Sequence, residues 1–130
     1  MASFSTLQLH LPHENLRYGV RPTRAFIDLD AIESNLSIVK RSLSPNTLVI
    51  AVVKANAYGH GAAFVAPAAI RGGASMLAVA TVTEGIVLRR EGVRSPILVL
   101  GPIDPSQCRS AVEHSLTLSV MDASMVEPLN

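Results

Sequence analysis

The segment that most limits how this chain can fold is the apolar run Leu48–Val53, which ends directly at Lys54. Alternate residues of a strand point to opposite faces, and in this run both faces are apolar. A strand of this kind is typical of a parallel sheet that is covered on each side. We therefore expect a central strand of an α/β protein here, with a lysine at its carboxyl end.

Other apolar runs of similar length share this character, and turn or helix-start signals follow them. They are Ala25–Leu29, Leu77–Thr81, Ile97–Gly101 and Leu116–Val120. Segments long enough for helices separate the runs, so strands and helices alternate through about five strands. This alternation predicts a parallel α/β fold. Both a doubly wound sheet and a (β/α)8 barrel satisfy it.

The expected helices begin at recognisable capping signals. Asp30–Glu33 and Thr81–Glu84 both read as capping boxes, and Asp104 is a cap followed by Pro105 at the first helical position. A further alanine-rich helix is expected between residues 62 and 71, where Pro67 predicts a kink or a late start.

The composition describes a globular chain and excludes several classes of function. Of the 130 residues, 48% are apolar and 16% are charged, which is enough for a buried core and argues against disorder. A net charge of +1 and an aromatic content of 4% argue against a nucleic-acid partner. No apolar run approaches the roughly 18 residues that a membrane span requires. The single cysteine excludes an internal disulfide, and no histidine has metal-ligand spacing, so no metal site is expected.

Residues 1–24 lack an apolar core flanked by positive charge, so they do not resemble a secretory signal. We expect a loosely ordered lead-in there, and a domain over residues 25–130. The expected compartment is the cytoplasm.

Lys54 is the leading candidate for chemistry. The chain has only two lysines, Lys40 and Lys54, and parallel α/β folds carry their active sites at the carboxyl ends of the strands. An amine held there is costly unless it is paired or used in a reaction. The alternative is a surface lysine whose stem packs on the sheet. Tyr58 lies four residues further on, and Gly59 and Gly61 allow a tight turn.

The string from Ala51 to Gly61 closely resembles the pyridoxal-phosphate attachment motif of bacterial alanine racemases. Further segments resemble the same family, namely Phe26–Ile32, Leu77–Ala80 and Pro96–Gly101. The resemblance implies the N-terminal part of a fold-type III (β/α)8 barrel, without the family's C-terminal β-domain.

The same resemblance implies a function. Lys54 would form a Schiff base with pyridoxal phosphate and then act as a proton-transferring base, Tyr58 would bind the cofactor phosphate, and Leu100 would lie beside the ring. The reaction would interconvert L-alanine and D-alanine for peptidoglycan synthesis. Because the family's second base is a tyrosine from the β-domain of a homodimer partner, we expect this chain alone to be inactive.

One alternative function is that of a non-catalytic pyridoxal-phosphate-binding protein of the homeostasis type, although that group's lysine motif lacks the continuation seen after Lys54. The other is an α/β domain with no cofactor.

Several other residues have structural explanations. Asp28 is expected to form a cap or a salt bridge more readily than a site, and Cys108 is expected to be inert packing on a helix. Asn56 is expected to support the turn after Lys54. Arg89 and Arg90 are expected to lie on a solvated helix face.

Overall fold

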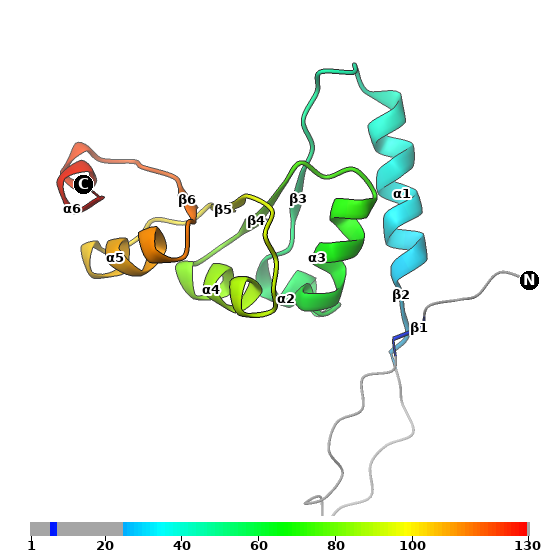
Figure 1. Ribbon diagram of the computed structural model, residues 1–130, viewed down its shortest axis with the longest axis horizontal. Coiled ribbons are helices and arrows are strands. Elements are labelled where there is room, and N and C mark those ends of the chain that lie inside the picture. The colour runs from blue at the N-terminus through cyan, green and yellow to red at the C-terminus, as the bar shows by residue number, and fades with distance from the viewer. Residues whose placement is uncertain (1–5, 8–24, 130) are drawn as a thin grey trace, which may run out of the picture.

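The computed structural model describes residues 6–7 and 25–129, so nearly all of the expected lead-in over residues 1–24 lies outside the described residues (Figure 1). The strands are β1 (Thr6–Leu7), β2 (Ile27–Asp28), β3 (Ile50–Val52), β4 (Met76–Val79), β5 (Ile97–Val99) and β6 (Thr117–Leu118). The helices are α1 (Leu29–Ser42), α2 (Lys54–Tyr58), α3 (Ala62–Arg71), α4 (Val82–Arg90), α5 (Pro105–Glu113), the 3-10 helix η1 (Ala123–Met125) and α6 (Val126–Leu129).

The main sheet is parallel, with the strand order β3-β4-β5-β6. This confirms the predicted α/β alternation, because α3, α4 and α5 each connect one strand to its parallel neighbour. All five predicted strands are present, but β2 pairs antiparallel with β1 and does not join the parallel sheet. The sequence pattern locates a strand by its local residues, whereas its partner depends on contacts between distant segments.

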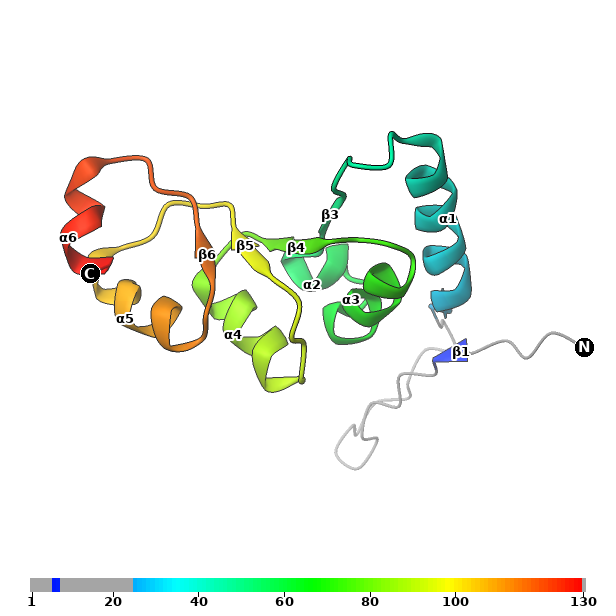
Figure 2. The same ribbon diagram turned by 45° about the horizontal axis from the view of Figure 1, so that its top comes forward.

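The helices α3, α4 and α5 lie together on one side of the sheet (Figures 1 and 2). Beneath them, Leu77, Val79, Ile97 and Val99 are completely buried and form the centre of the core. On β3, Ile50 remains 46% exposed and Val52 41% exposed. The expectation of a sheet covered on each side is therefore wrong for the described part of the chain, where helices cover only one face.

Capping interactions fix where the helices begin. The Asp28 carboxylate accepts a hydrogen bond from the backbone N–H of Ala31 at 2.9 Å, so α1 is capped by Asp28 and not by Asp30 as predicted. This confirms the structural role expected for Asp28. The predicted capping box at the start of α4 and the predicted cap of α5 are both confirmed. Helix α3 begins at Ala62, so Pro67 does not delay its start.

Arg89 contradicts the expectation of a solvated position. Its guanidinium donates hydrogen bonds to four backbone carbonyls, those of Val93 at 2.8 Å, Ser95 at 2.7 Å, His114 at 3.0 Å and Ser115 at 3.0 Å. It thereby joins the end of α4 to the segments that precede β5 and β6. Burial lowers the pKa of Arg89, with a smaller contribution from the neighbouring charge of Arg94. The adjacent Arg90 is exposed, as predicted.

Candidate active site at the carboxyl end of strand β3

Lys54 begins α2, two residues after the end of β3, and is partly buried. Its amine makes no hydrogen bond or ion pair with any residue that the structure describes. The second lysine differs, because the Lys40 amine donates a hydrogen bond to the carbonyl of Thr47. Of the two amines, that of Lys54 is thus the one left free for chemistry at the carboxyl edge of the sheet.

The backbone after Lys54 forms a turn of left-handed helix. Ala55, Asn56, Ala57 and Tyr58 have φ values of 50°, 54°, 52° and 54°. Residues other than glycine and asparagine cost roughly 1–2 kcal/mol each in this conformation, so Ala55, Ala57 and Tyr58 together hold about 3–6 kcal/mol of strain before any offsetting contact. We call residues 55–58 the left-handed turn. No local sequence signal predicts this turn, because alanine and tyrosine are seldom left-handed.

Hydrogen bonds on both sides of the left-handed turn hold it in place. The N–H of Ala57 donates to the carbonyl of Val53 at 2.9 Å, and the N–H of Ala62 donates to the Asn56 side-chain oxygen at 2.8 Å. The His60 ring nitrogen Nδ1 lies 2.9 Å from the carbonyl of Ala57. These contacts confirm that Asn56 supports the turn. Two glycines with positive φ follow the left-handed turn, Gly59 at 87° and Gly61 at 89°, as the predicted tight turn requires.

Glu84 connects the left-handed turn to the neighbouring strand. Its Oε1 accepts a hydrogen bond from the N–H of Ala55 at 2.7 Å. Its Oε2 accepts from the N–H of Ala80 at 2.7 Å and from that of Thr81 at 3.3 Å. One carboxylate therefore ties the residue after Lys54 to the segment that follows β4. The sequence predicted Glu84 as part of the capping box of α4, but it did not predict the contact with Ala55.

The two other residues implied by the resemblance lie on segments that leave the same edge of the sheet. Tyr58 closes the left-handed turn and is 59% exposed, with no hydrogen bond from its hydroxyl to any described residue. Leu100 directly follows β5 and is 39% exposed. Parallel strands bring their carboxyl ends to one edge. Val52 and Leu98 both pair with Ala78, so Lys54 and Leu100 occupy corresponding positions just beyond β3 and β5.

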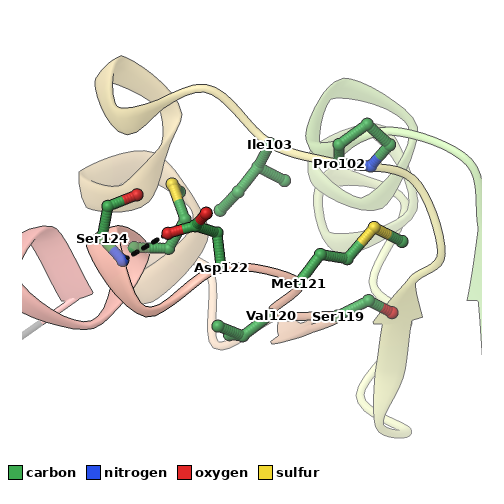
Figure 3. A pocket seen from close by; sticks show the side chains of 8 residues that line it. Pro102, Ile103, Ser119, Val120, Met121, Asp122 and Ser124 are labelled. Atoms are coloured by element: carbon green, nitrogen blue, oxygen red, sulfur yellow. Dashed lines mark hydrogen bonds between the residues drawn. The ribbon is translucent and has the colours of Figure 1, made fainter.

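A small cavity of about 220 Å³ lies beyond the ends of β5 and β6 (Figure 3). It is lined by Pro102, Ile103, Ser119, Val120, Met121, Asp122, Ser124 and Met125. The Asp122 carboxylate accepts a hydrogen bond from the N–H of Ser124 at 2.7 Å, and this bond lowers its pKa. Because that carboxylate caps η1 and the remaining lining is mainly apolar, this cavity offers no chemistry comparable to that of Lys54.

The described residues hold no group of three or more His, Cys, Asp or Glu side chains placed to bind a metal ion. None of their helices has the length and apolar character needed to cross a bilayer.

Comparisons with known proteins agree with this geometry. Residues 27–130 match the family model described as alanine racemase, N-terminal domain. An alanine racemase of Symbiobacterium thermophilum is 46% identical over 112 residues, which are 86% of this chain and 29% of that protein. The structure of alanine racemase from E. faecalis superposes with a TM-score of 0.76 at 39% identity, over 79% of this chain and 28% of that one.

Histidine racemase from Leuconostoc mesenteroides is also similar, with a TM-score of 0.70 at 33% identity over 78% of this chain and 27% of that one. The chain spans less than a third of the length of the relatives it matches. Together with the parallel sheet, these structural neighbours confirm the predicted partial (β/α)8 barrel.

Proposed function

This chain belongs to the alanine racemase N-terminal domain family, and on that premise we propose that it carries the cofactor-attachment site of a pyridoxal-phosphate-dependent racemase. The reaction is the interconversion of L-alanine and D-alanine, an isomerase activity. The observation that carries the proposal is the free amine of Lys54 at the carboxyl edge of a parallel sheet, next to a left-handed turn that hydrogen bonds hold on both sides.

The residues at this edge fit the chemical groups of pyridoxal phosphate. An amine without a partner suits the cofactor's aldehyde, and the exposed hydroxyl of Tyr58 suits a phosphate oxygen. When bound, the cofactor provides a ring that stabilises the negative charge left on the substrate's α-carbon once its proton is removed. Lys54 Nζ would attach the cofactor, and after release it would accept and return that proton. Tyr58 Oη would donate a hydrogen bond to the phosphate, and Leu100 would pack beside the ring.

We further propose that the complete enzyme is a cytoplasmic homodimer that supplies D-alanine for peptidoglycan. Its second proton-transferring tyrosine would come from a β-domain outside this chain. The domain carried here would extend over residues 25–130. Of the chain's two tyrosines, Tyr58 is assigned to the phosphate, and Tyr18 lies outside the described residues. The 130-residue chain alone is therefore expected to form no D-alanine above the rate with free cofactor.

The uncovered face of the sheet supports the barrel assignment. Ile50 and Val52 on β3 are apolar yet exposed, as expected for side chains that the remaining strands of a barrel would enclose. The similarity to a histidine racemase, as well as to alanine racemases, indicates that this part of the fold serves more than one amino acid. We therefore assign the choice of alanine to pocket walls outside this chain.

A chimaeric enzyme tests the proposal. Residues 27–129 would replace the matching segment of the Symbiobacterium thermophilum alanine racemase, and D-alanine formation from L-alanine would be measured with added pyridoxal phosphate. We expect activity in the chimaera and in its Lys40→Ala variant, and none in its Lys54→Ala variant. Racemisation that survives Lys54→Ala would refute the proposal. Cofactor attachment at Lys54 without any racemisation would favour the non-catalytic pyridoxal-phosphate-binding function instead.

A further inference from the structure

We propose that Glu84 is a positioning residue that fixes the Lys54 amine by holding the left-handed turn against the segment after β4. The inference rests on the proposed function of Lys54. Glu84 does not touch the reacting groups, and it acts through the backbone of Ala55, which is the residue bonded to Lys54.

The contact joins parts of the chain that are far apart. Ala55 and Glu84 are separated by 29 residues, and their 2.7 Å hydrogen bond connects the residue after Lys54 to the first turn of α4. The other hydrogen bonds of the left-handed turn end on nearby residues, namely Val53, Gly59, His60, Gly61 and Ala62. A left-handed stretch of alanine, asparagine and tyrosine does not persist by local preference, so an anchor outside the turn must help to hold it.

The chemistry of a carboxylate explains why glutamate occupies this position. Three N–H groups converge on its two oxygens, one from the left-handed turn and two from the start of α4. A carboxylate accepts hydrogen bonds at both oxygens, whereas the amide of glutamine accepts at only one and donates at the other. Glutamine satisfies a capping box but not this double connection.

The chain contains its own control for a plain capping role. In α5, Gln107 occupies the same third helical position, and its side chain accepts a hydrogen bond only from the N–H of Asp104 at 3.0 Å. Both boxes cap a helix of the same length, but only the one containing Glu84 reaches another segment. Truncation of each side chain to alanine therefore compares a cap that also holds Ala55 with a cap alone.

The experiment uses the 130-residue chain and the variants Glu84→Ala, Glu84→Gln and Gln107→Ala. Each protein is treated with pyridoxal phosphate and sodium borohydride, which reduces the bond between a lysine amine and the cofactor's aldehyde carbon. Peptide mass spectrometry then gives the ratio of label on Lys54 to label on Lys40. Amide hydrogen exchange at Ala55 is measured without cofactor, so it reports on the turn alone.

We expect Glu84→Ala to lower the ratio of label on Lys54 to label on Lys40 about tenfold, because a misplaced amine reacts slowly. The same variant should speed amide exchange at Ala55 about tenfold, because a hydrogen bond to a charged group is lost. Gln107→Ala should change neither quantity. Glu84→Gln, which retains a capping residue, should still lower the ratio.

An unchanged ratio in both Glu84 variants would overturn the inference and leave Glu84 as a helix cap only. If the unsubstituted chain shows no preference for Lys54 over Lys40, the proposed function fails instead. In that case Ala55 exchange still decides the inference, since equal exchange in Glu84→Ala and Gln107→Ala contradicts it.

Discussion

Replacement of Ala55 by glycine is predicted to stabilise the fold, the reverse of what alanine-to-glycine replacement does in an ordinary helix. Ala55 is exposed and left-handed at φ 50°, so glycine removes strain of roughly 1–2 kcal/mol without losing a buried methyl group. The greater freedom of glycine in the unfolded chain costs about 0.5–1 kcal/mol. The net change is an increase of about 0.5–1 kcal/mol in the free energy of unfolding.

Two matched variants test the predicted sign of this change in the free energy of unfolding. Ala63→Gly, in the right-handed helix α3, should lower the free energy of unfolding by about 1 kcal/mol. Ala57→Gly has the same relief of strain but loses a methyl group that is only 4% exposed, so its net effect should be near zero. Urea unfolding followed by circular dichroism gives all three values, and a shift of 1 kcal/mol moves the midpoint by about 0.5 M. If Ala55→Gly destabilises the chain as much as Ala63→Gly does, residue 55 is not strained as described.

Arg89→Ala should lower the free energy of unfolding by about 2–4 kcal/mol, because four carbonyls lose a charged donor at a partly exposed site. The control Arg90→Ala, on the same helix, should lower it by less than about 0.5 kcal/mol in the same urea titration. Gly101→Ala would place a Cβ 2.6 Å from the carbonyl oxygen of Ala80, so we expect the free energy of unfolding to fall by about 1–3 kcal/mol in the same urea titration. Hydrogen bonds from Ser106 lower the pKa of Asp104, so its stabilising effect is present above the pKa of an unfolded aspartate and is lost as pH falls through the lower folded value. Unfolding titrations between pH 6 and 2 should therefore show a weaker acid dependence in Asp104→Asn, and an unchanged dependence would contradict this assignment.

Much of the fold could be predicted from the sequence because its signals are local. Apolar runs bounded by turn residues located β2 to β6 but not β1, and the capping patterns at Thr81 and Asp104 located two helix starts. The first helix start was misplaced because Asp28 and Asp30 are both plausible caps, and only the hydrogen bond to Ala31 distinguishes them. Cys108 is buried on α5, in agreement with the expected packing role on a helix.

The features that the sequence did not reveal depend on contacts between distant segments. The pairing of β2 with β1 in place of the parallel sheet is one example. Arg89 is another, because its four carbonyl partners lie on two loops that meet only in the folded chain. At the candidate site, Lys54 and Tyr58 are predicted from the motif alone. The contact of Glu84 with Ala55 joins two distant segments and has no local sequence signal.

The left-handed turn shows why stability and function should separate at Ala55. Asn56 needs its side chain to bind the N–H of Ala62, Ala57 buries its methyl group, and Tyr58 supplies the hydroxyl assigned to the phosphate. Ala55 alone has no such use for its side chain, yet glycine does not occupy it. If the stiffness of an alanine beside Lys54 is what matters, Ala55→Gly should raise the free energy of unfolding while it lowers cofactor attachment at Lys54, a trade that is common at active sites. If attachment is unchanged or improved, the strain beside Lys54 has no part in placing its amine.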